Sequence, residues 1–326
     1  MSTNESGSHG ATPNQSESHM HPINHIAVIG SGVIGSSWAA LFLAAGHEVA
    51  VYDPAPDFEA TTRERIRSVW PTLKSLGMTE RADQSALRFC TSAVSAVSQA
   101  RFVQENIPER LELKHALYRE IEPHLEAHTV VASSASGLML SELQGGWQHP
   151  NRLILGHPFN PPHLIPLVEL MGNDKTDPDA LNVAESLYRG CGKVTIRVKK
   201  EVPAHVANRL QAALWREAIH LVAEGVASVE DVDKAVWAGP GLRWAAMGPH
   251  QLFHLGAGEG GLNEFCNRYG PSFHRWWDDL GRAELNPDTV AKLTEGIAAF
   301  DRGHSDDIAR RDALIEAMLN ATRPMR

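Results

Sequence analysis

The chain has 326 residues, of which 43% are hydrophobic, and this is enough for one large or two ordinary domains with apolar cores. Its formal net charge of -9, from 39 acidic against 30 basic residues, argues against a surface for nucleic acid or anionic membranes, because both need clustered positive charge. No apolar run approaches the ~20 residues that span a bilayer, no secretory signal opens the chain, and Cys90, Cys191 and Cys266 have unrelated spacings. We therefore expect a soluble, cytoplasmic protein without a disulfide framework or a zinc site.

Residues 1–22 are rich in Ser, Asn, Gly and His and nearly devoid of large apolar side chains. Such a composition cannot bury enough surface to order itself, so we expect a disordered tail. His9, His19, His21 and His25 invite comparison with a metal site, but their spacing is irregular. We expect no metal there.

From residue 23 to about 200, short apolar runs alternate with helical patterns. Strands are expected at 25–30, 47–53, 129–134 and in KVTIRVK. Further short apolar segments lie at 87–90 and 101–105 and in the later runs RLILGHPFNPP and LIPLVELM. Helices are expected at 33–45, 57–77, 111–125 and about 177–189. This alternation predicts an α/β domain with a mostly parallel sheet covered by helices on both faces.

Beyond about residue 200 the sequence shows long helical periods and few strand patterns. Pro203 suits the first turn of a long helix over about 204–225. We therefore divide the chain into a sheet domain at 23–200 and an all-helical domain at 201–326. The helical part holds five of the eight tryptophans: Trp215, Trp237, Trp244, Trp276 and Trp277.

A G-x-G-x-x-G motif follows the first expected strand directly and opens the first helix. Gly30 permits the tight turn, Gly32 lets the backbone approach a pyrophosphate, and Gly35 allows the helix to pack closely on the strand. The helix N-terminus at Val33 and Ile34 offers free N–H groups and a partial positive charge to phosphates. The motif in this context predicts a dinucleotide site.

Asp53 ends the second expected strand, 18 residues beyond Gly35. A carboxylate at this place accepts hydrogen bonds from the adenosine ribose hydroxyls and repels a 2′-phosphate. The site therefore favours NAD over NADP. The competing interpretation is a glycine turn followed by a surface Asp that caps the next segment.

Four polar residues stand near strand ends beyond the cofactor half, where open α/β sheets bind ligands: Ser136, His157, Glu169 and Asn208. Oxidation of a secondary alcohol by NAD+ needs a base for the hydroxyl proton, and histidine has a pKa near neutrality. A buried Glu169 beside His157 would fix the imidazole tautomer and stabilise the imidazolium, while Ser136 and Asn208 would orient substrate oxygens.

Each of these residues also has a structural interpretation. A histidine before proline in a loop is often structural, an in-strand Glu169 can pair with a distant Arg, and Ser136 can cap the following helix. A Ser–His–Glu hydrolase uses the same residue types, but the chain lacks a G-x-S-x-G elbow.

Several motifs in order resemble the 3-hydroxyacyl-CoA dehydrogenase family. They are the glycine motif with Asp53, ENIPERLELK (105–114), SSASGL (133–138), GHPFNPPHLIPLVEL (156–170) and EVPAHVANRL (201–210). The resemblance implies that His157 is the general base, that Glu169 is its partner, and that Ser136 and Asn208 contact substrate. It also implies that Glu109 and Lys114 border the nicotinamide side of the cofactor, and that the helical domain forms a homodimer interface.

Two stretches depart from the acyl-CoA enzymes. The chain has Ser134-Ala135 where an Asn-Thr pair is usual, and H-P-F-N-P from His157 where H-F-F-N-P is usual. These forms, with GPGLRWAAMGP (239–249), look like the branch of the family that acts on free hydroxy acids. The resemblance thus implies NAD-dependent oxidation of a small L-3-hydroxy acid, such as L-carnitine or L-gulonate, with a 3-hydroxyacyl-CoA as the alternative substrate.

Composition bears less decisively on the substrate. Residues 57–90 carry six Lys or Arg against five acids, a net charge of +1. This segment is therefore not a strongly basic surface for the phosphates of CoA. A trimethylammonium group would suit an aromatic cage, for which Trp237, Trp244, Phe253 and Trp276 are available. Packing in a helical core or at a dimer contact is the favoured explanation for these aromatic residues. Arg243 can form a bidentate pair with a substrate carboxylate or hold a surface acid. A catalytically silent structural protein, like the crystallin relatives of the family, is the remaining alternative.

Overall fold

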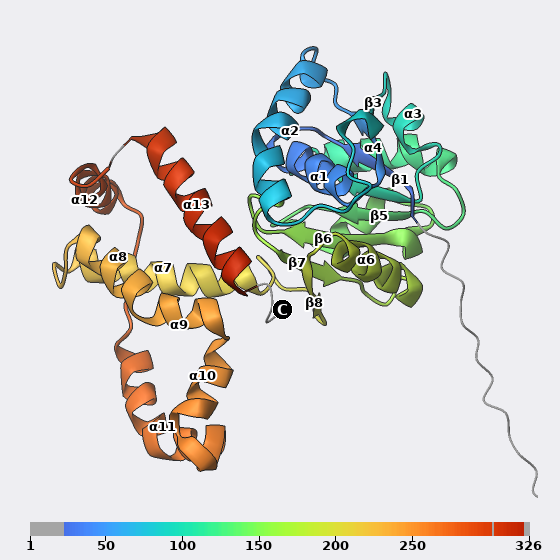
Figure 1. The fold of residues 1–326 in the computed structure, drawn as a ribbon. Coiled ribbons are helices and arrows are strands. Elements are labelled where there is room, and N and C mark those ends of the chain that lie inside the picture. Colours follow the sequence, from blue (N-terminus) through green and yellow to red (C-terminus); the bar gives the residue numbers. More distant parts are fainter. Residues whose placement is uncertain (1–22, 302, 323–326) are drawn as a thin grey trace, which may run out of the picture.

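One eight-stranded sheet carries the first half of the chain in the computed structural model, which describes residues 23–301 and 303–322 (Figure 1). The tail predicted at 1–22 lies outside the described residues. The strands follow the order β3-β2-β1-β4-β5-β6-β7-β8, and β7 alone among the described strands runs antiparallel to a neighbour, β6. Their bounds are β1 His25–Ile29, β2 Glu48–Tyr52, β3 Leu87–Phe89, β4 Phe102–Glu105, β5 Val130–Ser133, β6 Leu153–Pro158, β7 Leu167–Met171 and β8 Val194–Val198.

Helices cover both faces of this sheet, as the alternation of elements predicts. The first six strands have the 3-2-1-4-5-6 order of dinucleotide-binding folds. The helices of this part are α1 Val33–Ala44, α2 Phe58–Ser75, α3 Ala93–Val97, α4 Leu111–Ile121, α5 Leu140–Leu143 and α6 Pro178–Gly190. The expected fold class, a mostly parallel Rossmann-type sheet followed by a helical part, is confirmed.

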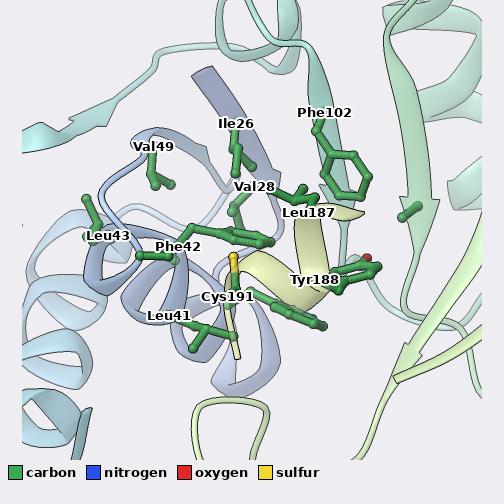
Figure 2. Packing of buried hydrophobic residues seen from close by; sticks show 14 of the residues in the cluster. Ile26, Val28, Leu41, Phe42, Leu43, Val49, Phe102, Leu187, Tyr188 and Cys191 are labelled. Carbon is green, nitrogen blue, oxygen red and sulfur yellow. The ribbon is translucent and has the colours of Figure 1, made fainter. Parts of the chain in front are cut away.

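Side chains of one strand enter two separate cores because successive residues point to opposite faces. Ile26 and Val28 of β1 join the core under α1, α2 and α6, whereas Ala27 and Ile29 join the core under α3, α4 and α5. Figure 2 shows the first core, where Phe42 of α1 and Tyr188 of α6 lie close to β1. Burial on both faces explains why this strand reads as a continuous apolar run.

The second half of the chain is helical and extends away from the sheet (Figure 1). Its helices are α7 Ala207–Ala223, α8 Val229–Ala238, α9 Pro240–Ala246, α10 Pro249–Gly256, α11 Gly261–Asp279, α12 Pro287–Ala298 and α13 His304–Thr322. The last helix returns to the sheet domain, where the Asn320 amide donates to the Ser75 hydroxyl at 3.0 Å. None of the described helices is both long and apolar enough to cross a bilayer.

The helical half has almost no core of its own. Within its described residues, the buried apolar side chains are Ile219, Val229 and Val232. Four of its five tryptophans expose more than half of their surface, namely Trp215, Trp237, Trp276 and Trp277. Exposed apolar surface on this scale is typical of a protein interface.

The prediction that Pro203 lies in the first turn of the long helix is wrong. The helix α7 begins at Ala207, and Ala204 and His205 precede it with φ of 63° and 50°. Two consecutive residues in the left-handed region cannot continue a right-handed helix. The chain therefore turns sharply between the sheet and the helical half before α7 starts.

Candidate active site

The glycine turn has the shape that the motif predicts. Gly30 has φ of 85°, and a Cβ there would lie 2.8 Å from the Asn106 backbone. A Cβ on Gly35 would lie 1.8 Å from the Gly30 carbonyl oxygen, so α1 packs on the turn with no room for a side chain. In contrast, a Cβ on Gly32 would meet no atom within 4 Å. Open space beside Gly32, at the N-terminus of α1, fits the pyrophosphate of a dinucleotide.

Asp53 connects the end of β2 to this turn. Its Oδ2 accepts the Ser31 N–H at 2.7 Å, and its Oδ1 accepts the Ala55 N–H at 2.9 Å. The Arg65 guanidinium donates to the Ser31 carbonyl at 3.0 Å, a contact that the sequence analysis does not predict. The carboxylate thus stands beside the turn, where an adenosine ribose is expected in this fold.

A cleft of about 500 Å³ lies where β4, β5 and β6 end and α7 begins. Its walls include five predicted site residues: Glu109, Lys114, Ser136, His157 and Asn208. Ile34 of the first turn of α1 also lines it, so the cleft is continuous with the dinucleotide turn. The sequence-predicted chemistry and the cofactor turn therefore meet in one place.

His157 and Glu169 form a buried pair across neighbouring strands. They face each other in the antiparallel register of β6 and β7, and His157 Nδ1 lies 2.8 Å from Glu169 Oε2. His157 is 5% exposed and Glu169 is 1% exposed. The partner of the in-strand Glu169 is therefore the histidine and not a distant Arg.

Glu169 also holds the start of α7. Its Oε1 accepts the backbone N–H groups of Val206 at 2.9 Å and Ala207 at 3.0 Å. Burial raises the pKa of Glu169, but the hydrogen bonds from His157, Ala207 and Val206 together outweigh it and bring the pKa below 4.5. An ionised carboxylate only accepts hydrogen bonds, so His157 Nδ1 carries the proton. In the neutral imidazole, the lone pair is then on the other ring nitrogen, Nε2, which can accept a proton.

His205 is a buried site residue that the sequence analysis missed. Its ring centroid lies 5.0 Å from that of His157, and its Nε2 donates to the Ala135 carbonyl at a long 3.4 Å. Its Nδ1 is buried with no hydrogen-bond partner in the described part of the chain. Burial, reinforced by the neighbouring His157, lowers the pKa of His205 and keeps it neutral. The sequence contains one sign of this role, because His205 is a polar residue within the otherwise apolar stretch that precedes Asn208.

Glu109 holds the loop that carries Ser136. The Ser136 hydroxyl donates to Glu109 Oε2 at 2.9 Å, and the backbone N–H groups of Ser136, Gly137 and Leu138 all point to Oε1. Partial burial raises the pKa of Glu109, but these donors, led by the Gly137 N–H, outweigh it and lower the pKa overall. Ser136 therefore caps no helix; it lies in a loop fixed around an anionic side chain.

Lys114 lines the cleft, but its charge is already neutralised. It is 1% exposed, and its Nζ donates to Glu105 Oε1 at 2.6 Å and to the Ile107 carbonyl at 3.3 Å. The other oxygen of Glu105 accepts the hydroxyl groups of Tyr118 at 2.9 Å and Ser133 at 2.6 Å. Glu105, which the sequence analysis did not single out, is thus the centre of a fully buried network at the end of β4.

The predicted substrate residues fall into two groups. Asn208 of α7 lines the cleft, as does Gln211 three residues later. Arg243 and Trp244 lie on α9 and do not line the cleft of their own chain. Of the four aromatics considered for a cage, Phe253 stacks on Phe265, Trp276 packs against Phe273, and Trp237 and Trp244 are exposed.

Comparison with known proteins places these features in a family. Residues 25–202 match the NAD binding domain of 3-hydroxyacyl-CoA dehydrogenase, and residues 205–294 match its C-terminal domain. The chain belongs to the 3-hydroxyacyl-CoA dehydrogenase family. The resemblance carried by the ordered motifs is thereby confirmed.

Individual relatives cover almost the whole chain. L-carnitine dehydrogenase of Streptomyces griseus subsp. griseus is 44% identical over 302 residues, which are 92% of this chain and 90% of that protein. L-carnitine dehydrogenase of Pseudomonas aeruginosa is 41% identical over 303 residues, which are 92% and 94% of the two chains. Among solved structures, the NAD+-dependent 5-formyl-3-hydroxy-2-methylpyridine 4-carboxylic acid 5-dehydrogenase is 32% identical, with a TM-score of 0.78 over 93% of this chain and 98% of that one.

The protein is an NAD-dependent dehydrogenase. The predicted cofactor and enzyme class are confirmed by these comparisons, which favour neither a hydrolase nor a catalytically silent protein. The open space at Gly32, the helix N-terminus and Asp53 fit the cofactor.

Alanine substitutions at two glycines should separate cofactor binding from folding. Gly35→Ala places a Cβ against the Gly30 carbonyl, so we expect a loss of about 1–3 kcal/mol in the free energy of unfolding. Gly32→Ala fills open space, so we expect nearly unchanged stability and weaker NADH binding. Urea denaturation and a fluorescence titration with NADH measure the two effects. Wild-type stability of Gly35→Ala contradicts the packing argument.

Removing the amine of Lys114 should lower the free energy of unfolding, because Glu105 then stays buried without a cation. Lys114→Met leaves an uncompensated buried carboxylate, so we expect a loss of about 3–5 kcal/mol in the free energy of unfolding. The double variant Lys114→Met/Glu105→Gln should recover part of it, because no buried charge remains. Urea denaturation tests both, and equal stability of the single and double variants rules out this role of the pair.

Proposed function

We propose that this protein oxidises the hydroxyl group of a small L-3-hydroxy acid to the 3-oxo acid with NAD+, and that L-carnitine is its substrate. The observation that carries the proposal is the His157–Glu169 pair, at 2.8 Å, whose histidine lines a cleft continuous with the dinucleotide turn. The relatedness to L-carnitine dehydrogenases over 92% of the chain supports the choice of substrate.

The chemistry follows from the hydrogen bonds around His157. Its Nε2 takes the proton of the substrate hydroxyl while the C3–O bond becomes a carbonyl. When bound, NAD+ accepts the hydride that leaves C3. The imidazolium formed at His157 is stabilised by the ionised Glu169, which already accepts the Nδ1–H. Ser136 and Asn208, both in the cleft wall, orient the substrate oxygens by hydrogen bonds.

Charge in the cleft supports a substrate with a cationic end. Glu109 lines the cleft, and its lowered pKa keeps it anionic at neutral pH. A trimethylammonium group is attracted to such a carboxylate, whereas the phosphates of CoA are repelled by it. The net of +1 over residues 57–90 adds little attraction for CoA.

Further properties belong to the same proposal. We place the cofactor function in residues 23–200 and the substrate and dimer functions in residues 201–326. The exposed apolar surface of the helical half supports a homodimer joined through that half. We propose that this dimer works in the cytoplasm.

A substrate panel tests the assignment. Purified protein with NAD+ is given L-carnitine, D-carnitine, L-gulonate or 3-hydroxybutyryl-CoA, and NADH formation is followed by absorbance. We expect the highest kcat/KM with L-carnitine and little activity with D-carnitine, because only the L enantiomer directs its C3–H bond at the cofactor while its hydroxyl group faces His157. Oxidation of the CoA ester alone overturns the assignment to free hydroxy acids.

Substitution of the proposed base tests the mechanism. His157→Gln keeps a side chain of similar reach but no proton acceptor of suitable pKa, so kcat should fall by about 100- to 10,000-fold. NADH affinity should stay near the wild-type value, since the dinucleotide turn is untouched. The control is His128→Gln, at an exposed position outside the cleft, which should keep wild-type kcat. Normal turnover of His157→Gln excludes it as the base.

A further inference from the structure

A charge is missing from the cleft if the substrate is a free acid, as the proposed function requires. The one Lys or Arg among the residues that line the cleft is Lys114. Its ammonium group is 1% exposed and lies 2.6 Å from Glu105 Oε1, so its charge is already compensated by that carboxylate. His157 must be neutral to act as a base. A substrate whose trimethylammonium group lies near Glu109 would thus find no exposed Lys or Arg in the cleft lining for its carboxylate.

Arg243 is a positively charged residue with no carboxylate partner among the described residues. It lies exposed on α9, and the described residues give its side chain no hydrogen bond or ion pair. Exposed apolar residues flank it, with Leu242 at 66% and Trp244 at 39% exposed, and Trp237 of α8 is 66% exposed. No residue of α9 is buried. An unpaired guanidinium in an apolar surround suits bidentate binding of a carboxylate once water is excluded.

Within one chain, Arg243 and the cleft remain apart. The residues that α7 contributes to the cleft, Asn208 and Gln211, lie in its first turns, and neither α8 nor α9 contributes a residue to the wall. Figure 1 shows α10 and α11 extending further from the sheet. A second molecule must bring the guanidinium if it is to reach a substrate.

A second copy of this chain meets both requirements. The helical half buries only three apolar side chains within its described part, so it needs apolar surface from a partner to complete its packing. A twofold dimer uses the same surfaces twice, so each chain supplies α9 and receives the other one. The charges are complementary, because the cleft needs a cation and α9 has an unpaired one.

We propose that each active site is completed by the other chain of a homodimer, and that the partner subunit's Arg243 binds the substrate carboxylate at the open side of the cleft. Trp244 packs beside this ion pair and excludes water from it. The site of one chain holds the cofactor, His157 and Glu169, and the other chain closes it.

Truncation of the arginine gives the first test. Arg243→Ala should raise the KM for L-carnitine about 10- to 100-fold, the loss expected for one charge-assisted contact, while kcat changes less. Binding of the deoxy analogue of L-carnitine, measured by calorimetry on the enzyme with NADH, should weaken by the same factor. Arg243→Lys should lie between, because it keeps the charge without the planar fork. The control Arg119→Ala, exposed on α4 outside the cleft, should leave both values unchanged. Wild-type KM in Arg243→Ala overturns the proposal.

Mixed dimers decide which chain supplies the arginine. His157→Gln and Arg243→Ala chains are co-expressed with different affinity tags, and dimers that carry both tags are isolated. If sites are shared, one of the two sites has both native residues, and activity at low L-carnitine should be about half that of wild type. If each chain uses its own arginine, no site is intact, the activity is no more than half that of the Arg243→Ala dimer, and the proposal fails.

The two proposals fail in different ways. Wild-type protein that oxidises no substrate of the panel refutes the proposed function. The shared site alone is refuted if the wild type is active but the mixed dimers show no restored activity. It is also refuted if the active wild type sediments as a monomer at the assay concentration.

Discussion

The ionised side chain of Glu169 is the contact on which the rest of the site depends. A carboxylate that is 1% exposed is costly to bury unless it is hydrogen-bonded, and here it accepts three donors from two parts of the chain. One donor is the His157 ring, and the other two are the first N–H groups at α7. The same interaction therefore fixes the tautomer of the proposed base and joins the helical half to the sheet.

This anchoring has a conformational cost. To direct the Val206 and Ala207 N–H groups at the carboxylate, the chain holds Ala204 and His205 at positive φ. For residues other than glycine this costs about 1–2 kcal/mol each, and such conformations gather at functional sites. The turn also buries the His205 ring against His157, where one ring nitrogen lacks a partner. Burial and the neighbouring ring lower the pKa of His205, which favours an uncharged ring beside the proposed base.

The parts of the site that local sequence predicts are those that depend on local geometry. The glycine turn, the acid at the end of β2 and the polar residues at strand ends follow from backbone sterics and from the topology of a parallel sheet. The start of α7 could not be placed in this way, since the preference of Pro203 for a first helical turn is weak beside the hydrogen bonds to Glu169. The Glu105–Lys114 pair was equally out of reach, because a strand end and a helix nine residues later reveal their contact only when the chain is folded.

The two halves of the molecule satisfy their apolar side chains in different ways. The sheet domain buries its strands under helices on both faces and has a complete core, whereas α7–α13 leave large aromatic side chains at the surface. A helix that is amphipathic but lacks a covering neighbour gains its stability from association. Since Glu169 ties α7 to His157, ordering of the helical half and positioning of Asn208 are parts of one equilibrium. If the proposed dimer and the proposed base are correct, assembly and catalysis share an energetic link that passes through a single buried carboxylate.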